Sequence, residues 1–397
     1  MEGKDPDKAI NAAQKAIELN ANMAGAYVSL GQAYLLKDSS FQANGYFTKA
    51  IQSDPDNYDA YIGRGLANMS VPEIAIADFN KAALINDKNA TAYYNRAFCR
   101  AAIQDYDAAM EDLDKAIMLN DKYMEAYELR GSVYYFVKRN YKAAINDLDQ
   151  LLRSDPANQS ALKMRSQAFY EMKEYDKAIF DLDKLIELDL SVAQFYINRG
   201  AIYQQMNKIP EALADYTRGI AKDTLNTEVY RLRGWLYFEQ GDYKMSFKDF
   251  DKILQINPKH ANALYNRGTI YHIQQNYEQA IADFTRLINL DTTYADAYWE
   301  RSRAYYGKKD LDAAIADLDK VIRLDPKRQI AYVIRGGIYQ SENKNQLAID
   351  DYTRAISLNA SDAATYTRRG LLYRDMGKKD LADADLKKAA ELKQSAP

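Results

Sequence analysis

Ten arginines recur along the chain about every 34 residues, and their regularity is the first feature that could carry chemistry. They are Arg64, Arg96, Arg130, Arg165, Arg199, Arg233, Arg267, Arg301, Arg335 and Arg369. A row of guanidinium groups at even intervals could follow the phosphates of a nucleic acid. The arginines could equally be buried inside the protein, provided that each guanidinium has an acidic partner.

Ten aspartates supply such partners, because they recur with the same period, 14 to 17 residues after each arginine. They are Asp78, Asp112, Asp147, Asp181, Asp215, Asp249, Asp283, Asp317, Asp351 and Asp385. In the first repeating segment both positions are apolar or aromatic, with Leu30 and Tyr46, so the two positions change together. We therefore predict internal arginine–aspartate ion pairs, since an unpaired buried charge is costly.

Catalytic and metal-binding chemistry has few residues to use. The chain has two histidines, His260 and His272, and one cysteine, Cys99. These cannot form a Ser-His-Asp or Cys-His grouping, an intrachain disulfide or a cysteine-based metal cluster. The phosphate-binding patterns GxxxxGK[ST] and GxGxxG are absent from the sequence. We expect no enzyme activity, no cofactor and no bound metal.

Composition narrows the partners further. The 397 residues carry a net charge of −3, with 27% charged and 47% hydrophobic residues. This balance favours neither nucleic acid nor an anionic membrane, and no apolar run reaches the roughly 18 residues of a membrane span. Localisation stays open: one cysteine suits the cytoplasm, whereas a bacterial periplasmic protein whose signal has been removed would look the same.

The elements that must position these residues form a repeat, which we number from 1 to 34. Repeats begin at Ala24, Tyr58, Ala90, Met124, Gln159, Ala193, Thr227, Ala261, Ala295, Gln329 and Ala363. Nine have 34 residues; the second loses two at the turn near Val71, and the fourth gains one near Asn140. Position 4 is mostly Tyr, position 8 is always small, position 11 is mostly aromatic and position 20 is almost always Ala. Small residues at 8 and 20 would let two helices approach closely, with aromatics around them.

This pattern resembles the tetratricopeptide repeat (TPR) family over residues 24–396. The resemblance implies an all-α fold in which helix-turn-helix units stack into a right-handed superhelical solenoid. We expect eleven such units in one continuous solenoid, preceded by a leading half repeat (second helix only) in residues 1–23. Seventeen of the 33 tyrosines fall at positions 4 and 11, so most of the aromatic excess is expected to be core.

The resemblance also implies that the first helices line a concave groove, faced by positions 2, 5, 6, 9, 12 and 13. Two aromatic clusters occupy these positions. Repeats three to five offer Tyr94, Phe98, Tyr135, Phe136 and Tyr170, and repeats seven to nine offer Arg231, Trp235, Phe238, Tyr265, His272, Trp299, Arg303 and Tyr306. Because Trp, Tyr and Arg are enriched at binding hot spots, we predict that the clusters contact a partner. The alternative is that these rings pack between neighbouring first helices.

Two recognition patterns of the family are incomplete here. No three consecutive repeats supply the Lys and Asn positions of the carboxylate clamp, and the asparagine ladder at position 6 is broken, with only Asn95, Asn198 and Asn266. The groove positions carry nine acidic and five basic residues, which argues against a nucleic-acid channel.

We therefore expect a non-catalytic scaffold that binds an extended or helical protein segment in the groove. The alternative is a structural subunit, or a homo-oligomer formed through the terminal repeats, that builds a larger assembly with its end faces and convex surface.

Overall fold

The computed structural model describes residues 5–394, and every regular element in that range is an α-helix. The helices are α1 (Pro6–Leu19), α2 (Ala24–Leu36), α3 (Ser40–Ser53), α4 (Tyr58–Ala67), α5 (Pro72–Ile85), α6 (Ala90–Ala102), α7 (Tyr106–Leu119), α8 (Met124–Phe136), α9 (Tyr141–Ser154), α10 (Gln159–Glu171), α11 (Tyr175–Leu188), α12 (Ala193–Gln205), α13 (Ile209–Lys222), α14 (Thr227–Glu239), α15 (Tyr243–Ile256), α16 (Ala261–Ile273), α17 (Tyr277–Leu290), α18 (Ala295–Gly307), α19 (Leu311–Leu324), α20 (Gln329–Ser341), α21 (Asn345–Leu358), α22 (Ala363–Asp375) and α23 (Lys379–Gln394). Even-numbered helices from α2 to α22 are the first helices of the eleven repeats, and the following odd-numbered helices are the second helices. The expected all-α repeat fold is confirmed.

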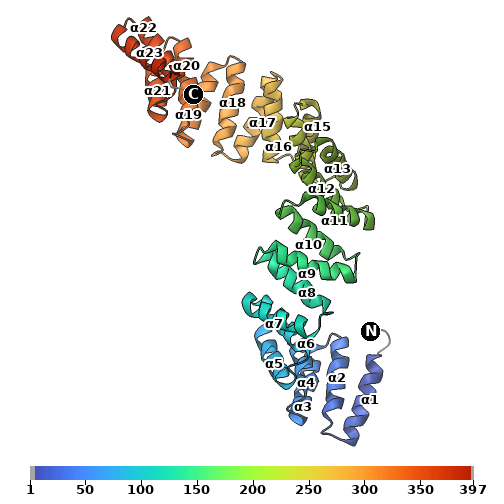
Figure 1. Ribbon diagram of the computed structural model, residues 1–397. Helices are drawn as coiled ribbons and strands as arrows, with labels where there is room; N and C mark the ends of the chain where they lie inside the picture. Colours follow the sequence, from blue (N-terminus) through green and yellow to red (C-terminus); the bar gives the residue numbers. More distant parts are fainter. Residues whose placement is uncertain (1–4, 395–397) are drawn as a thin grey trace. The chain divides into compact units, whose positions relative to one another are not determined.

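The chain forms two compact parts, which we call the N-terminal part (Met1–Asn207) and the C-terminal part (Lys208–Pro397). The boundary falls inside repeat six, between α12 and α13. Within each part, each helix packs against the next one along the chain (Figure 1). The core of the N-terminal part includes Leu148 and Leu182, and that of the C-terminal part includes Phe250 and Leu287. No helix within residues 5–394 combines the length and the apolar character that a membrane crossing needs.

Close helix approach within a repeat depends on the small residues at positions 8 and 20. Position 20 is at most 2% exposed in all eleven repeats. In repeat two, a Cβ atom added to Gly65 at position 8 would lie 2.5 Å from the Phe79 ring, and in repeat eight one on Gly268 would lie 2.9 Å from Phe284. Both rings are completely buried. Glycine at position 8 therefore makes room for a large ring at position 24 of the second helix.

The turn between the two helices uses a left-handed backbone in every repeat but the second. Asp38, Gln104, Arg139, Lys173, Asn207, Gln275, Lys309 and Asn343 have φ between 51° and 65°, and Gly241 and Gly377 fill the same place. This conformation ends a helix and reverses the chain within three or four residues.

Repeat two departs from this turn, but not in the way the sequence suggests. Its first helix α4 has 10 residues where other first helices have 13, and its turn has four residues, 68–71. The prediction that the turn itself is shortened is therefore wrong, because the missing residues come from the last turn of α4. Asn68 caps this shortened helix and accepts a hydrogen bond from Asn44 Nδ2 at 2.6 Å.

Candidate protein-binding groove

The repeated arginines lie inside the protein and bind the repeated aspartates. In nine repeats Nε and Nη2 of position 7 donate to the two carboxylate oxygens of position 23. The pairs are Arg64–Asp78, Arg96–Asp112, Arg130–Asp147, Arg165–Asp181, Arg233–Asp249, Arg267–Asp283, Arg301–Asp317, Arg335–Asp351 and Arg369–Asp385. The predicted ion pair is confirmed in every repeat from two to eleven that lies wholly within one part. The interpretation of these arginines as a phosphate-binding ladder is wrong.

Each of these arginines also reaches back to the preceding repeat, which the sequence analysis missed. Nη1 donates to the side chain at position 25 of that repeat, at 2.5–2.9 Å in nine cases and 3.5 Å for Thr48. The acceptors are Thr48, Asn80, Asp114, Asp149, Asp183, Thr217, Asp251, Thr285, Asp319 and Thr353. Position 25 is Asp, Asn or Thr in all ten repeats that another repeat follows, and this restriction is visible in the sequence. One guanidinium therefore joins both helices of its own repeat to the repeat before it.

Tyrosines at positions 4 and 11 complete the surroundings of the guanidinium. The Arg301 guanidinium lies 5.6 Å from the Tyr298 ring centre and 5.8 Å from that of Tyr305. Arg369 has the same relation to Tyr366 and Tyr373. Cation–π attraction thus explains why these positions favour Tyr. Hydrogen bonds to Asp283 raise the pKa of Arg267 against the opposing effect of burial, so the pair stays ionised.

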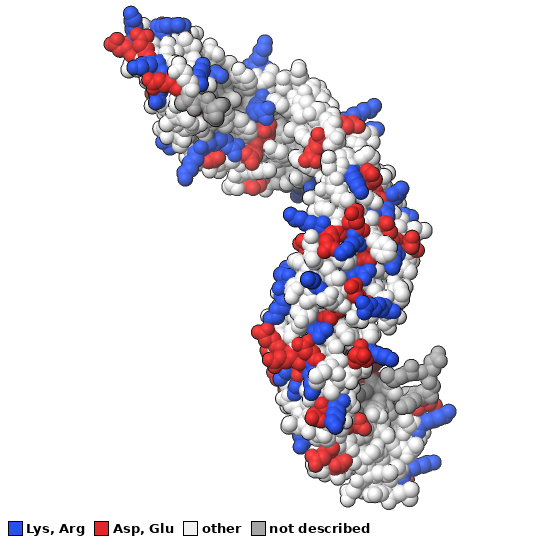
Figure 2. All heavy atoms as spheres, viewed as in Figure 1, with Lys and Arg blue, Asp and Glu red and all other residues white. Residues whose placement is uncertain are grey.

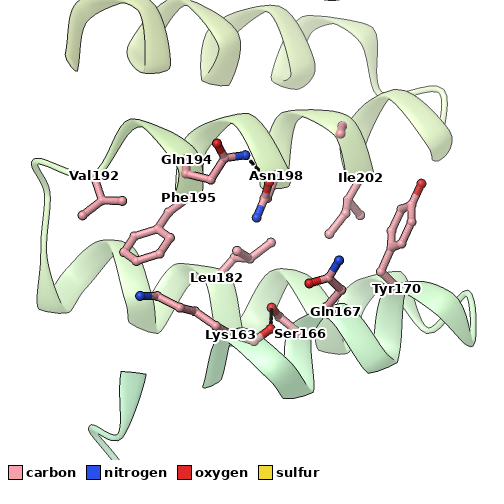
Figure 3. A pocket seen from close by; sticks show the side chains of 11 residues that line it. Lys163, Ser166, Gln167, Tyr170, Leu182, Val192, Gln194, Phe195, Asn198 and Ile202 are labelled. Atoms are coloured by element: carbon pink, nitrogen blue, oxygen red, sulfur yellow. Dashed lines mark hydrogen bonds between the residues drawn. The ribbon is translucent and has the colours of Figure 1, made fainter. Parts of the chain in front are cut away.

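A pocket of about 500 Å³ opens on the first-helix face between α10 and α12 (Figure 3). We call it the α10–α12 pocket. Its lining residues are Lys163, Ser166, Gln167, Tyr170, Leu182, Val192, Gln194, Phe195, Asn198, Ala201 and Ile202. Six of them occupy positions 2, 5, 6, 9 and 12, which the family resemblance assigned to the groove. Of the predicted partner-binding residues, only Tyr170 lines this pocket, because the prediction favoured aromatic side chains and passed over the amides.

Two residues of repeat six that line the pocket differ from those at the same positions of repeat seven. Position 3 is Ala in eight repeats but Phe195 here, and its ring is 3% exposed. A ring in place of a methyl group occupies space between α10 and α12. Position 9 is Ala201, where the next repeat carries Trp235. Both Phe195 and Ala201 line the pocket.

The pocket has an apolar floor and a polar rim. Leu182, Phe195 and Ile202 are at most 3% exposed and form the apolar surface. On the rim, Gln194 Nε2 donates to Asn198 Oδ1 at 2.7 Å. The Lys163 ammonium lies 5.3 Å from the centre of the Phe195 ring. Such a recess, apolar inside with a few polar groups at its edge, is typical of ligand-binding sites.

The C-terminal part presents the second predicted cluster on α14, α16 and α18, which we call the aromatic surface. Trp235 is 41% exposed and stacks on Phe238, with ring centres 5.6 Å apart. Tyr306 is 56% exposed. Trp299 is half-buried, and the Arg328 guanidinium lies 5.9 Å from its ring. Within residues 5–394 no ring contact joins Trp235 to Trp299, so the two indoles are not a single platform.

The arginines of the aromatic surface already have acidic partners. Arg231 Nε donates to Glu228 at 2.7 Å, and Arg303 Nη1 donates to Glu300 at 2.8 Å. Burial raises the pKa of Glu300, and Arg303 opposes this shift. These pairs leave the surface close to neutral. It is consequently a weaker site for acidic side chains than the two arginines suggested from the sequence.

Tyr265 and His272 are half-buried members of the aromatic surface. Burial raises the pKa of Tyr265 to about 12, with a further contribution from Glu300. Burial and the nearby Arg303 lower the pKa of His272. Its Nδ1 atom is buried and makes no hydrogen bond to the described residues. His272 therefore favours its neutral form.

The remaining predicted residues, in repeats three to five, do not form one surface. Tyr94 packs against Tyr123 at 4.8 Å, and Phe98 is 45% exposed. Tyr135 is only 4% exposed and belongs to the core of the N-terminal part, so its place in the proposed contact surface is corrected. Its neighbour Phe136 is 61% exposed instead. In repeat four, Tyr135 therefore packs in the core, as the alternative interpretation of these rings predicts.

Comparison with known proteins assigns the family. Family models described as tetratricopeptide repeat match residues 90–123, 129–189 and 227–260. A further model, the ETO1 C-terminal domain, matches residues 259–394. The chain belongs to the TPR family. No curated protein matches it.

Solved structures that are similar to parts of this chain come from several proteins. The C-terminal part of a TPR repeat-containing protein from Cytophaga hutchinsonii has a TM-score of 0.54 at 16% identity, covering 60% of this chain and 97% of that one. MamA has 28% identity and a TM-score of 0.40, covering 41% and 94%. YrrB, described as a TPR protein with an unusual peptide-binding site, has 24% identity and a TM-score of 0.41, covering 47% and 95%.

Proposed function

We propose that this chain is a non-catalytic scaffold that binds an extended or helical protein segment on the face formed by its first helices. The observation that carries the proposal is the α10–α12 pocket, an apolar recess with a polar rim. Core packing and the arginine ladder use positions 3, 4, 7, 8, 10 and 11 of the first helix. Positions 2 and 9 are buried in none of the repeats, and positions 5, 6 and 12 are buried in only some of them. A protein segment suits such a face because its anchors can differ from repeat to repeat.

The aromatic surface is a second proposed contact region, which lies in the C-terminal part. Trp235, Phe238 and Tyr306 expose ring area without a partner ring from another helix of the same face. Exposed aromatic side chains near a binding face carry much of the energy of protein interfaces. We infer that Tyr265, His272 and Trp299 contribute at its edges, since each is partly accessible. In the N-terminal part we infer that Tyr94, Phe98 and Tyr170 contribute contacts, since each is at least partly accessible.

Nucleic acid is not part of the proposal. The ladder arginines that could have followed phosphates are 13–25% exposed, and aspartates hold them. Figure 2 shows basic and acidic side chains interspersed on the visible face in both parts, with no broad basic area. Binding to a polyanion needs such an area.

A library of random peptides with blocked termini tests the proposed function. We expect the intact chain to select peptides whose binding falls at least fivefold when the first-helix face is changed at Gln167→Glu and Trp235→Ala. The control is Lys142→Glu, an exposed residue on the second helix α9. Selected peptides that respond to Lys142→Glu, and not to the first-helix changes, would contradict the proposal.

A second candidate function is assembly through the end of the array. Leu19 on α1 and Phe41 on α3 are each 90% exposed, which favours a contact near the N-terminal repeats. Light scattering separates the two functions. A concentration-dependent dimer that Leu19→Asp together with Phe41→Asp converts to a monomer would support assembly, whereas a monodisperse monomer would exclude it.

A further inference from the structure

We propose that the α10–α12 pocket binds an internal, extended stretch of a protein in which a large apolar residue is followed or preceded by an acidic one. The inference rests on the proposed function and adds the chemistry of the occupant. The apolar side chain would enter the recess, the carboxylate would meet Lys163, and the amides of the rim would hold the backbone.

The preference for an apolar side chain of the bound peptide follows from the apolar floor of the pocket. Leu182, Phe195 and Ile202 present hydrocarbon, and Tyr170 and Val192 form the sides (Figure 3). A volume of about 500 Å³ lies within the ~300–1,000 Å³ range of ligand pockets. Burying apolar area removes it from water, so a large aliphatic or aromatic side chain is favoured here over a polar one.

The acidic preference follows from the charge of the lining. Lys163 is the only charged residue among those that line the pocket, and it makes no ion pair with any residue of the described range. This differs from Arg231 and Arg303 on the aromatic surface, which glutamates already neutralise. An ammonium at the edge of an apolar recess without a carboxylate attracts an acidic side chain of the partner.

The backbone contact follows from the amide pair on the rim. Gln194 Nε2 donates to Asn198 Oδ1, and this leaves Asn198 Nδ2 as a donor and Gln194 Oε1 as an acceptor. In Figure 3 the Asn198 amide nitrogen points toward the pocket. Gln167 lies across the recess on α10 and supplies another donor and acceptor. An extended peptide offers alternating N–H and C=O groups that such amides can bind.

A position-scanning library of hexapeptides, acetylated and amidated so that no terminal charge is present, tests this inference on the full-length chain. We expect enrichment of Leu, Phe or Met next to Asp or Glu. Ala201→Trp should fill the recess and weaken the selected peptides at least tenfold. The repeat tolerates this residue at position 9, where repeat seven carries Trp235. Lys163→Glu, at an exposed position, should exchange the acidic preference for a basic one.

The outcomes separate the pocket from the wider proposal. The selected peptides could bind the Ala201→Trp and Lys163→Glu variants as tightly as the wild type, and bind the Trp235→Ala variant more weakly. This result would overturn the pocket inference and leave the proposed function intact. Enrichment of basic residues next to the apolar one would also overturn it. If neither the hexapeptides nor longer random peptides bind to the wild-type chain, both proposals are contradicted. Lys142→Glu is the matched control, a charge reversal outside the first-helix face.

Discussion

The α10–α12 pocket and the aromatic surface are built on the same repeated arginine–aspartate pairs, but they differ in the residue at position 9 and in the pairing of their charges. In the pocket, position 9 is Ala201, and the one charged lining residue, Lys163, has no ion pair with a described residue. On the aromatic surface, position 9 is Trp235, which is 41% exposed and stacks on Phe238, and the arginines are paired. The ladder beneath is the same, and position 9 carries residues of very different size in the two regions. The exposed surface can therefore vary along the chain while the arginine–aspartate pairs stay the same.

The largest expected effect tests whether the scaffold is in fact common to both regions. Arg165→Ala and Arg267→Ala each remove a guanidinium that binds one aspartate in its own repeat and one in the preceding repeat. We expect each to reduce the free energy of unfolding by ~3–5 kcal/mol, since buried Asp181 or Asp283 loses its partner. Urea denaturation of the two variants measures this.

The matched control for this prediction is Arg286→Ala. Arg286 also contacts Asp283, at 3.5 Å, but it is 45% exposed. Its loss should cost less than about 1 kcal/mol. If Arg165→Ala and Arg267→Ala differ from each other by more than they differ from Arg286→Ala, the two regions do not share one scaffold.

The next effect concerns the two indoles of the aromatic surface. Replacing both Trp235 and Trp299 by Ala should weaken a groove-bound segment at least tenfold, about 1.4 kcal/mol. The two single substitutions should affect stability differently, because Trp299 is more buried than Trp235. Trp235→Ala should leave stability nearly unchanged, whereas Trp299→Ala should destabilise the C-terminal part, because its ring packs against the core and under Arg328. Isothermal titration and thermal melts provide both numbers, and an equal loss of stability in the two single variants would show that Trp235 is a packing residue.

A smaller effect is expected where the scaffold itself is irregular. Repeat two has the shortest first helix, lacks the left-handed turn residue and carries Asn68 where nine of the eleven repeats have an aromatic. In an array whose repeats contact only their neighbours, local weakness produces local opening. Hydrogen exchange should show residues 58–89 opening more readily than the repeats of either binding region. Even protection along the chain would refute this.

The smallest expected effect is a pH response confined to the aromatic surface. The pKa of His272 is lowered in the folded chain, so protons favour the unfolded state. The contribution of neutral His272 is fully present above the unfolded value of 6.5 and is lost as pH falls below it. The melting temperature of the wild type should therefore fall more between pH 7.5 and 5.5 than that of His272→Asn. Identical pH profiles would contradict the assigned environment of His272.

The scaffold was largely predictable from the sequence, because repetition shows the same physical requirement many times. The small residues at position 8, the Ala at position 20 and the joint change of Arg and Asp identify contacts that recur in each repeat. Position 25 carried a similar signal, and it was missed because its partner lies in the next repeat. The shortened α4 was assigned to the wrong place, since a deletion in one repeat has no second example to compare with.

The candidate site was less predictable because it depends on differences between repeats. Aromatic type alone selected Tyr135, which is buried, and passed over Gln167, Gln194 and Asn198. Phe195 departs from the Ala that most repeats carry at position 3, but Val229 and Thr365 depart from it as well. This signal alone therefore does not single out the pocket.

The most direct test of the central claim, that the first-helix face binds the partner, is photo-crosslinking from a selected peptide to the intact chain. A photoreactive group replaces one side chain of the peptide, and mass spectrometry identifies the residues that it labels. We predict labelling on first helices, with Gln167 on α10 or Asn198 on α12 among the sites, and loss of these labels in Ala201→Trp. Labelling confined to second helices, such as Lys142 on α9, would contradict the account.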